Sequence, residues 1–254
     1  DTTTLTFYLS TTGTTPCAVD VDTMRVKLAP APLVDAGPDM TVCANDTVKL
    51  SGSLENTSGS NWSGGSGTFD TPNQINTNYF SSPIDTSAGT ITLSLTTITS
   101  SFCNAISDEV TITFAPVPST EVGPDITVCA DSSYISLQGF VNYANSGLWL
   151  TNGTGTFSLS NASLNTSYYP STTDTSSASV KLWMESTGNG VCAATADTLN
   201  IIFTPIPRIE AGNDITTCAD ATTISLNGSL TVATQGTWST NGTGSFDNVN
   251  SNTP

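Results

Sequence analysis

The chain has 254 residues, a length that fits one large domain or two to three small ones. Thr and Ser make up 79 of these residues, 21 acidic residues outnumber 5 basic ones to give a net charge of −16, and histidine is absent. This charge disfavours nucleic-acid binding, which depends on phosphate neutralisation by Lys and Arg. Without an imidazole, Ser-His-Asp and Cys-His nucleophiles and histidine-bound zinc or haem are excluded. No run approaches the 18 apolar residues of a membrane span, so we expect no membrane insertion by this segment.

The chain begins with a strand-like alternation, DTTTLTFYLS, and its last residues, SFDNVNSNTP, follow another strand-like run. We therefore expect a segment of a longer exported polypeptide whose signal and anchor lie elsewhere. Six cysteines without a CxxC pair favour disulfides over a metal site. Disulfides persist outside the cytosol, which favours an extracellular location.

The first predicted elements are two strands on either side of Cys17. Both alternate apolar and mostly polar residues, a period of two that is typical of half-buried strands. The same pair of strands recurs around Cys103 and Cys192. The apolar positions of the first strand in the three copies are Leu5/Phe7/Leu9, Ile91/Leu93/Leu95 and Val180/Leu182/Met184. Those of the second strand are Met24/Val26/Leu28, Val110/Ile112/Phe114 and Leu199/Ile201/Phe203.

Longer motifs show that the whole chain is built of repeats. Three copies of one motif are VDAGPDMTVCANDTVKLSG (34–52), EVGPDITVCADSSYISLQG (121–139) and IEAGNDITTCADATTISLNG (209–228). A Trp-containing strand follows in each copy, at Trp62, Trp149 and Trp238, and two copies then place Asp85 and Asp174 in a similar turn. The sequence predicts the C-terminal part of a truncated repeat (1–32), two complete repeats (33–118 and 119–207) and the N-terminal part of another (208–254).

Each repeat is predicted to be an all-β, immunoglobulin-like sandwich. About seven short strands in under 90 residues, with one Trp on an early-middle strand, are typical of that fold. The recurring Trp is expected in the core. Each repeat ends in a Pro-x-Pro linker, at Pro30/Pro32, Pro116/Pro118 and Pro205/Pro207. Because proline fixes φ, these linkers predict stiff spacing and an elongated rod, unless the prolines merely end an edge strand.

Acidic residues recur just after each linker, where they flank a glycine. They are Asp35/Asp39, Glu121/Asp125 and Glu210/Asp214. Oxygen ligands at such a junction could bind Ca²⁺, the one cofactor considered, although Asp in a turn also caps backbone groups. A glycosidase pair is the remaining acid/base option, but the sequential Asp108 and Glu109 would point to opposite faces of a strand. We expect no enzyme.

Three cysteine pairings stay open, because six cysteines allow 15 connectivities. Same-repeat bridges, Cys43–Cys103 and Cys129–Cys192, are favoured and leave Cys17 and Cys218 for partners outside the segment. Pairing the second cysteine of each repeat with the next cysteine along the chain would instead join Cys17–Cys43, Cys103–Cys129 and Cys192–Cys218. A third arrangement crosses a joint between repeats, for example Cys43–Cys192, because the two cysteines of one repeat are expected at opposite poles of the sandwich.

The AGPD-x-TVC opening, the W…GTGTF strand, the YxPSxxDT turn and the C…D-x-[VL]-x-[IV]-x-F closing strand resemble known tandem repeats. These are the immunoglobulin-like, PKD-like repeats of Bacteroidota surface proteins, and in particular the giant gliding-motility adhesins of the SprB type. The resemblance implies type IX secretion, attachment to the outer membrane through regions outside this segment, and a fibre-like adhesin role. It also implies O-glycosylation at Thr2, Thr23, Thr47 and Thr198.

Two functions are therefore expected. The first is a structural stalk of disulfide-stapled repeats in a surface filament, whose partners are neighbouring repeats and other copies of the chain. The alternative is a carbohydrate-binding module of a larger secreted protein that contacts a polysaccharide or substratum. Tyr8 and Trp183, at the same outward position of equivalent strands, are the candidate contact residues.

Overall fold

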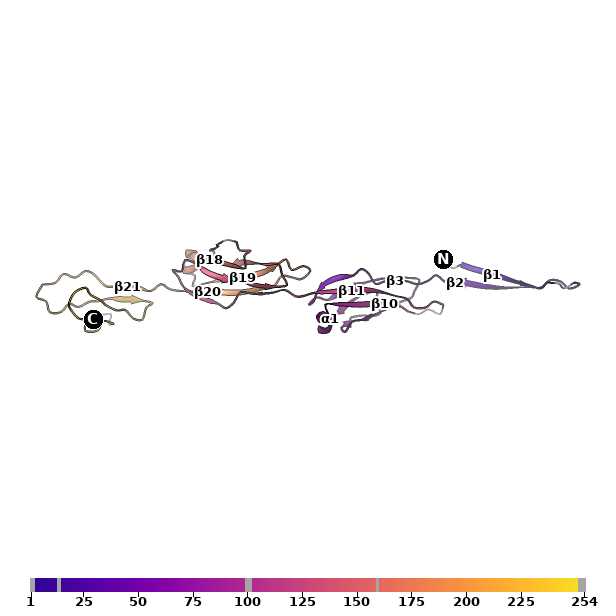
Figure 1. Ribbon diagram of the computed structural model, residues 1–254, viewed down its shortest axis with the longest axis horizontal. Coiled ribbons are helices and arrows are strands. Elements are labelled where there is room, and N and C mark those ends of the chain that lie inside the picture. The colour runs from indigo at the N-terminus through magenta and orange to yellow at the C-terminus, as the bar shows by residue number, and fades with distance from the viewer. Residues whose placement is uncertain (1–2, 13–14, 99–101, 159, 251–254) are drawn as a thin grey trace. The chain divides into compact units, whose positions relative to one another are not determined.

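The computed structural model describes residues 3–12, 15–98, 102–158 and 160–250. Within these ranges the chain forms 22 strands and two short helices (Figure 1). By its internal contacts the chain divides into two compact units. Unit 1 comprises residues 1–117 and the loop 189–193, and unit 2 comprises residues 118–188 and 194–254.

The sandwich of unit 1 has one four-stranded sheet. Its order is β4 (Met40–Cys43), β11 (Ser107–Ala115), β10 (Thr90–Thr97) and β7 (Ser60–Gly64). The long strands β10 and β11 are antiparallel, with Ile91 opposite Ile112. Strand β4 is parallel to β11, with Cys43 opposite Ala115.

The facing strands of unit 1 form a three-stranded sheet and a short ladder. The sheet has the order β5 (Val48–Ser51), β9 (Asn76–Phe80) and β8 (Thr68–Phe69), and the ladder pairs β3 (Leu33–Asp35) with β6 (Ser53–Glu55). If the strands are lettered in chain order, β7, β10 and β11 are strands C, F and G of an immunoglobulin-like sandwich, and β5, β9 and β8 are its strands B, E and D. The first strand, A, is divided between β3 and β4. The predicted fold class is confirmed.

The core of unit 1 lies between these sheets. Trp62 is 1 % exposed, and Leu93, Leu95 and Ile112 are fully buried. Along β10 the inward Leu93 and Leu95 alternate with half-exposed residues, as the period of two predicts. The predicted core position of the recurring Trp is confirmed for this copy.

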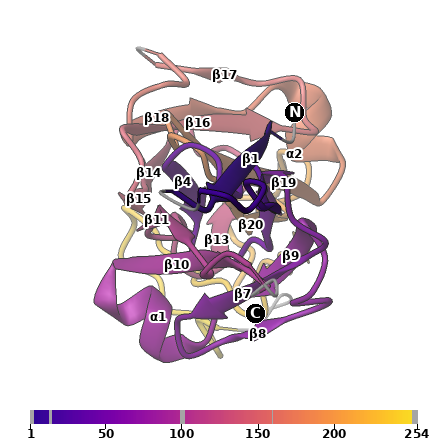
Figure 2. The same cartoon turned by 90° about the vertical axis from the view of Figure 1, so that its right-hand side faces the viewer.

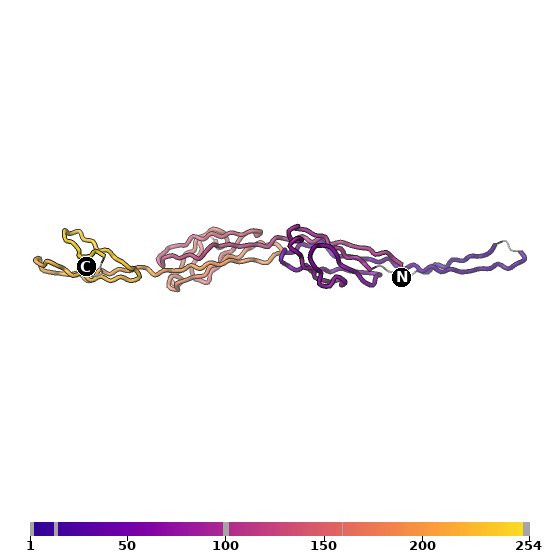
Figure 3. The backbone as a smooth tube through the Cα atoms, turned by 90° about the horizontal axis from the view of Figure 1, so that it is seen from below, coloured from indigo at the N-terminus to yellow at the C-terminus, as the bar shows by residue number. Residues whose placement is uncertain are grey.

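Unit 2 contains a second sandwich with the same strand order. One sheet consists of β13 (Ile126–Cys129), β20 (Ala196–Thr204), β19 (Ser179–Thr187) and β16 (Ser146–Thr151). Opposite it are β14 (Ile135–Gln138), β18 (Asn165–Tyr169) and β17 (Thr156–Phe157), and β12 (Ser119–Glu121) pairs with β15 (Phe140–Asn142). Its core contains the fully buried Trp149 and Leu182. The tube in Figure 3 follows the backbone through both sandwiches.

Each sandwich carries one short helix after its fifth principal strand, α1 (Pro83–Ala88) in unit 1 and α2 (Thr172–Ser176) in unit 2 (Figure 2). Both begin with a capping box, in which a serine hydroxyl accepts the backbone N–H of an aspartate three residues later and the aspartate accepts the serine N–H. The serines are Ser82 and Ser171, and the aspartates are Asp85 and Asp174. The capping box explains why so short a segment is helical.

The terminal segments form smaller ladders. Strands β1 (Thr3–Ser10) and β2 (Val21–Leu28) make an antiparallel hairpin with Phe7 opposite Met24. Both of these side chains are at least half exposed. Strands β21 (Arg208–Glu210) and β22 (Ser229–Thr231) pair with Ile209 opposite Leu230.

Candidate functional site

A buried tyrosine–aspartate pair fixes α1 to the sandwich of unit 1. The Tyr79 hydroxyl donates to Asp85 Oδ2 over 2.7 Å and accepts the Gly67 N–H over 2.8 Å. The Asp85 carboxylate also accepts the backbone N–H groups of Ser66, at 2.8 Å, and Ser82, at 2.9 Å. Tyr79 is fully buried and Asp85 is 2 % exposed. One carboxylate therefore links the loop after β7, the strand β9 and the helix.

The same contacts shift the pKa values of Tyr79 and Asp85. Burial raises the pKa of Tyr79 to about 12, and the hydrogen bond to Asp85 adds to this. Burial opposes ionisation of Asp85, but the hydrogen bonds from Ser82, Tyr79 and Ser66 outweigh it and lower the pKa of this carboxyl below its usual value. At neutral pH the pair is a phenol donating to a carboxylate.

Unit 2 repeats this arrangement. The Tyr168 hydroxyl donates to Asp174 Oδ2 over 2.8 Å, and Asp174 accepts the N–H groups of Thr154, at 2.8 Å, and Ser171, at 2.9 Å. Burial raises the pKa of Tyr168; the pKa of Asp174 is lowered because hydrogen bonds outweigh its burial. The recurrence of Asp85 and Asp174 is visible in the sequence, but their role as hydrogen-bond acceptors was not predicted from it. The capping-box spacing was the available signal.

The structure contains one disulfide among its described residues, Cys43–Cys192, with a Cα–Cα distance of 4.9 Å and a sequence separation of 149. The favoured same-repeat bridges Cys43–Cys103 and Cys129–Cys192 are therefore wrong, since each uses a cysteine of this bond. The bond is instead the cross-joint pairing. Its physical reason is the position of the loop 189–193, which belongs by sequence to the second complete repeat and by contacts to unit 1.

The surroundings of the remaining five cysteines, Cys192 of the disulfide among them, differ. Cys192 Sγ lies 3.5 Å from the carbonyl oxygen of Pro116, and Cys103 Sγ lies 4.0 Å from that of Pro30. Cys129 is a half-buried thiol at the end of β13, and Cys218 is an exposed thiol. Cys17 is exposed as well.

The acids predicted for calcium accept hydrogen bonds from the protein. Asp35 accepts the Gly37 N–H over 2.7 Å, Asp39 accepts the Thr111 N–H over 2.7 Å, and Asp125 accepts the Asn200 N–H over 2.8 Å. The other candidates are Glu121 in β12, Glu210 in β21 and the exposed Asp214. Within the described ranges no group of three or more His, Cys, Asp or Glu residues could hold a metal ion. Calcium binding stays a prediction.

The predicted surface residues lie in different surroundings. Thr23, Thr47 and Thr198 are exposed, whereas Thr2 lies outside the described residues. Tyr8 is 72 % exposed. Trp183 is half-buried, and its Nε1 donates to Glu185 over 3.0 Å.

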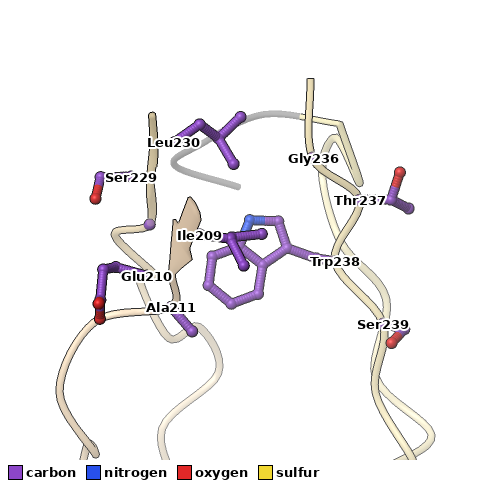
Figure 4. Close-up of a pocket in the computed structure, with 10 residues that line it drawn as sticks. Ile209, Glu210, Ala211, Ser229, Leu230, Gly236, Thr237, Trp238 and Ser239 are labelled. Atoms are coloured by element: carbon purple, nitrogen blue, oxygen red, sulfur yellow. The ribbon is translucent and has the colours of Figure 1, made fainter. Parts of the chain in front are cut away.

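A cavity of about 300 Å³ lies in the C-terminal segment, beside β21 and β22. Figure 4 shows the Ile209 side chain against the Trp238 ring, with Leu230 directed toward them. The equivalent Trp62 of unit 1 is 1 % exposed and is paired in the sheet with the fully buried Leu95 of β10. The apolar lining residues Ile209, Leu230 and Trp238 are the counterparts of core residues of unit 1.

Over the described parts of the chain, no helix has the length and apolar character that a membrane crossing requires.

Comparison with known proteins gives similarity only to solved structures. No family model matches, and no curated protein matches. Among solved structures, the titin I-band fragment I67–I69 is 8% identical, with a TM-score of 0.40, and the match covers 80% of this chain and 76% of that one. Drosophila N-cadherin EC1-4 is 13% identical, with a TM-score of 0.39, covering 73% of this chain and 53% of that chain. Sidekick-1 immunoglobulin domains 1-5 are 14% identical, with a TM-score of 0.36, covering 80% and 46%. The chain thus spans about half the length of the last two.

Proposed function

We propose that this chain is a structural stalk segment of an extracellular surface filament or adhesin. The observation that carries the proposal is the Cys43–Cys192 disulfide, which covalently ties a strand of one repeat to a loop of the next. Such a bond suits a protein that bears tension, and it persists outside the cytosol. The linker between the two sandwiches supports the same function, because only Pro116–Pro118 separates β11 from β12.

The proposal includes the finer points suggested by the repeat motifs. The repeats resemble those of Bacteroidota gliding-motility adhesins of the SprB type, from which we infer type IX export, outer-membrane attachment elsewhere in the polypeptide and O-glycans on the exposed Thr23, Thr47 and Thr198. Lateral association with other copies would require cations or sugars to offset the charge of −16. Calcium at the acids after each linker would serve that purpose, and isothermal titration with CaCl₂ tests it.

The rod is tested by small-angle X-ray scattering of the purified chain. We expect an extended particle whose maximum dimension falls when Pro116 and Pro118 are both replaced by glycine and the disulfide is reduced. The same double replacement at Pro30 and Pro32 is the matched control, because it leaves the linker between the two sandwiches unchanged. A compact particle, or one unchanged by the Pro116/Pro118 replacement under reducing conditions, contradicts the stiff linker.

The stalk is tested by immunogold electron microscopy of intact cells that produce the protein, with an antibody against one repeat. Label strung along thin fibres that project from the envelope supports the proposal. Label confined to the cell surface, or to compact soluble particles, contradicts it.

Carbohydrate binding is the second candidate. It is favoured by the exposed Tyr8 and the half-buried Trp183, which occupy the same position on β1 and β19. Aromatic side chains exposed on a sheet can stack on sugar rings. A glycan-binding assay with the double variant Tyr8→Ala/Trp183→Ala as control distinguishes this function, since a stalk alone retains no sugar.

A further inference from the structure

The first cysteine of each complete repeat occupies the same backbone position. Cys43 is the last residue of β4 and lies opposite Ala115 of the parallel strand β11. Cys129 is the last residue of β13 and lies opposite Thr204 of the parallel strand β20. In each case the residue after the cysteine donates its N–H to the carbonyl of that opposite residue, over 2.9 Å. The sandwich therefore presents Cys129 as it presents Cys43, but Cys129 forms no disulfide with any described residue.

The second cysteine of each complete repeat also occupies an equivalent position. Cys192 is in the loop between β19 and β20, next to the carbonyl of Pro116, and Cys103 is in the loop between β10 and β11, next to the carbonyl of Pro30. Each proline is the first of the Pro-x-Pro linker that precedes the repeat of that cysteine. Both loops therefore reach back to the linker in front of their own repeat.

We propose that every joint in this protein carries a disulfide of one fixed register, from the first cysteine of a repeat to the second cysteine of the next. Cys43–Cys192 is the instance within this chain. Cys129 is then the attachment point for the second cysteine of the repeat that begins at residue 208. Closing this bond removes two protons and two electrons from the two thiols. A disulfide oxidant accepts them and is reduced to two thiols.

This register gives the array two interleaved covalent paths. The first covalent path crosses from Cys43 to Cys192 through the disulfide and then follows the backbone from residue 192 to Cys218. Cys218 is the first cysteine of its repeat and so begins the next disulfide. This path bypasses the backbone between residues 43 and 192. The second path uses the segment from Cys103 to Cys129 in the same way. At roughly 3.5 Å per extended residue, the short segment limits the distance between Cys43 and Cys218 to about 90 Å. Without the disulfide, the fully extended backbone between them would reach about 610 Å. Unfolding a sandwich thus releases little length under tension.

The proposal deepens the stalk function, on which only its mechanical meaning rests. It is tested with the full chain carrying a second copy of residues 119–207 inserted after Pro207, so that a complete repeat follows Cys129. The copy carries the exposed Val191→Ile as a mass label beside its second cysteine. The protein is oxidised in a glutathione redox buffer, treated with a maleimide, and digested under non-reducing conditions for mass spectrometry.

We expect the labelled Cys192 to be linked to a Cys129 peptide. Replacing Cys129→Ser in the original repeat should leave the labelled cysteine fully alkylated, whereas the same replacement in the inserted copy should leave it linked. The inserted repeat reuses a sequence that forms a complete sandwich, and protection of its amides from hydrogen exchange verifies its folding in every variant.

The register is overturned if Cys129→Ser in the inserted copy, and not in the original repeat, abolishes the link to the labelled cysteine. A link from the labelled cysteine to Cys218 overturns it too. Alkylation of the labelled cysteine in the unsubstituted protein overturns it as well. The scattering experiment on reduced linker variants does not depend on these bonds, so a failure of the register and a failure of the rod are distinguishable.

Discussion

The Tyr79–Asp85 pair makes a quantitative prediction about the stability of unit 1. The substitution Tyr79→Phe keeps the buried ring but removes the hydroxyl, which donates to the Asp85 carboxylate over 2.7 Å and accepts the Gly67 N–H over 2.8 Å. Because the pair holds α1 to the sandwich, we expect this one oxygen to matter more than a typical side-chain hydroxyl.

The magnitude follows from the two hydrogen bonds. A hydrogen bond to a charged group contributes about 1.5–3 kcal/mol, and a buried N–H left without its acceptor costs about 1–3 kcal/mol. The Asp85 carboxylate keeps its hydrogen bonds from the N–H groups of Ser66 and Ser82. From the lower to middle part of these two ranges, we expect the free energy of unfolding of unit 1 to fall by about 3 kcal/mol.

The measurement is urea denaturation monitored by hydrogen exchange and mass spectrometry, because peptides from each unit then report the unfolding of that unit separately. Tyr169→Phe is the matched control. Tyr169 follows Tyr168 in unit 2 and is 43% exposed, so the loss of its hydroxyl should cost under about 0.5 kcal/mol. Tyr168→Phe should reproduce the large effect in unit 2. A loss below about 1 kcal/mol for Tyr79→Phe would refute the reasoning.

Three further predictions concern pH, backbone conformation and covalent connectivity. Because the pKa of Asp85 is lowered, its contribution to stability should be complete above the usual value of 3.8 and be lost as the pH falls below it. Because the pKa of Tyr79 is raised, its contribution should be complete below pH 10 and be lost as the pH rises to about 12. Thermal unfolding measured across the pH range checks both. Gly37→Ala should destabilise more than Gly123→Ala in urea unfolding: both have positive φ, costing about 1–2 kcal/mol, but only at Gly37 would a Cβ meet a backbone oxygen, at 2.6 Å. A single protease cut between Cys43 and Cys192 should leave one band on a non-reducing gel and two after reduction, and two bands without reductant would contradict the disulfide.

The sandwich could be predicted from the sequence because its signal is local. A half-buried strand alternates inward and outward residues whatever surrounds it, so Leu93 and Leu95 are identified by spacing alone and are fully buried in the structure. The core position of Trp62 follows instead from its place on an early-middle strand of an immunoglobulin-like sandwich. The short helices could have been predicted too, from a serine followed three residues later by Asp85, but the surrounding strand pattern made the segment look like a turn.

The hydrogen-bonded pair could not be predicted in the same way, and the disulfide could be named only as one of three open pairings, because both depend on residues brought together by the fold. Asp85 accepts the N–H of Ser66, 19 residues earlier, so its role needs the position of the loop after β7. Cys43 and Cys192 are separated by 149 positions, whereas spacing within a repeat favours the nearer Cys103 as the partner of Cys43. The deciding fact is where the loop 189–193 lies, and no periodicity encodes that.

What recurs between the repeats, and what does not, supports a scaffold rather than a binding surface. The Tyr–Asp pair holds a helix to its sandwich in both units. The strand-end cysteine occupies the same position in both, and at Cys43 it forms the disulfide to Cys192. The outward position that carries Tyr8 in β1 and Trp183 in β19 is Ser94 in β10. A surface that bound one ligand along the array would need its contact residue in each repeat, whereas a stalk needs only its internal contacts and its joints. If the proposed stalk is the function, substitution of the Tyr–Asp pair or of the disulfide cysteines should impair it more than substitution of Tyr8 or Trp183.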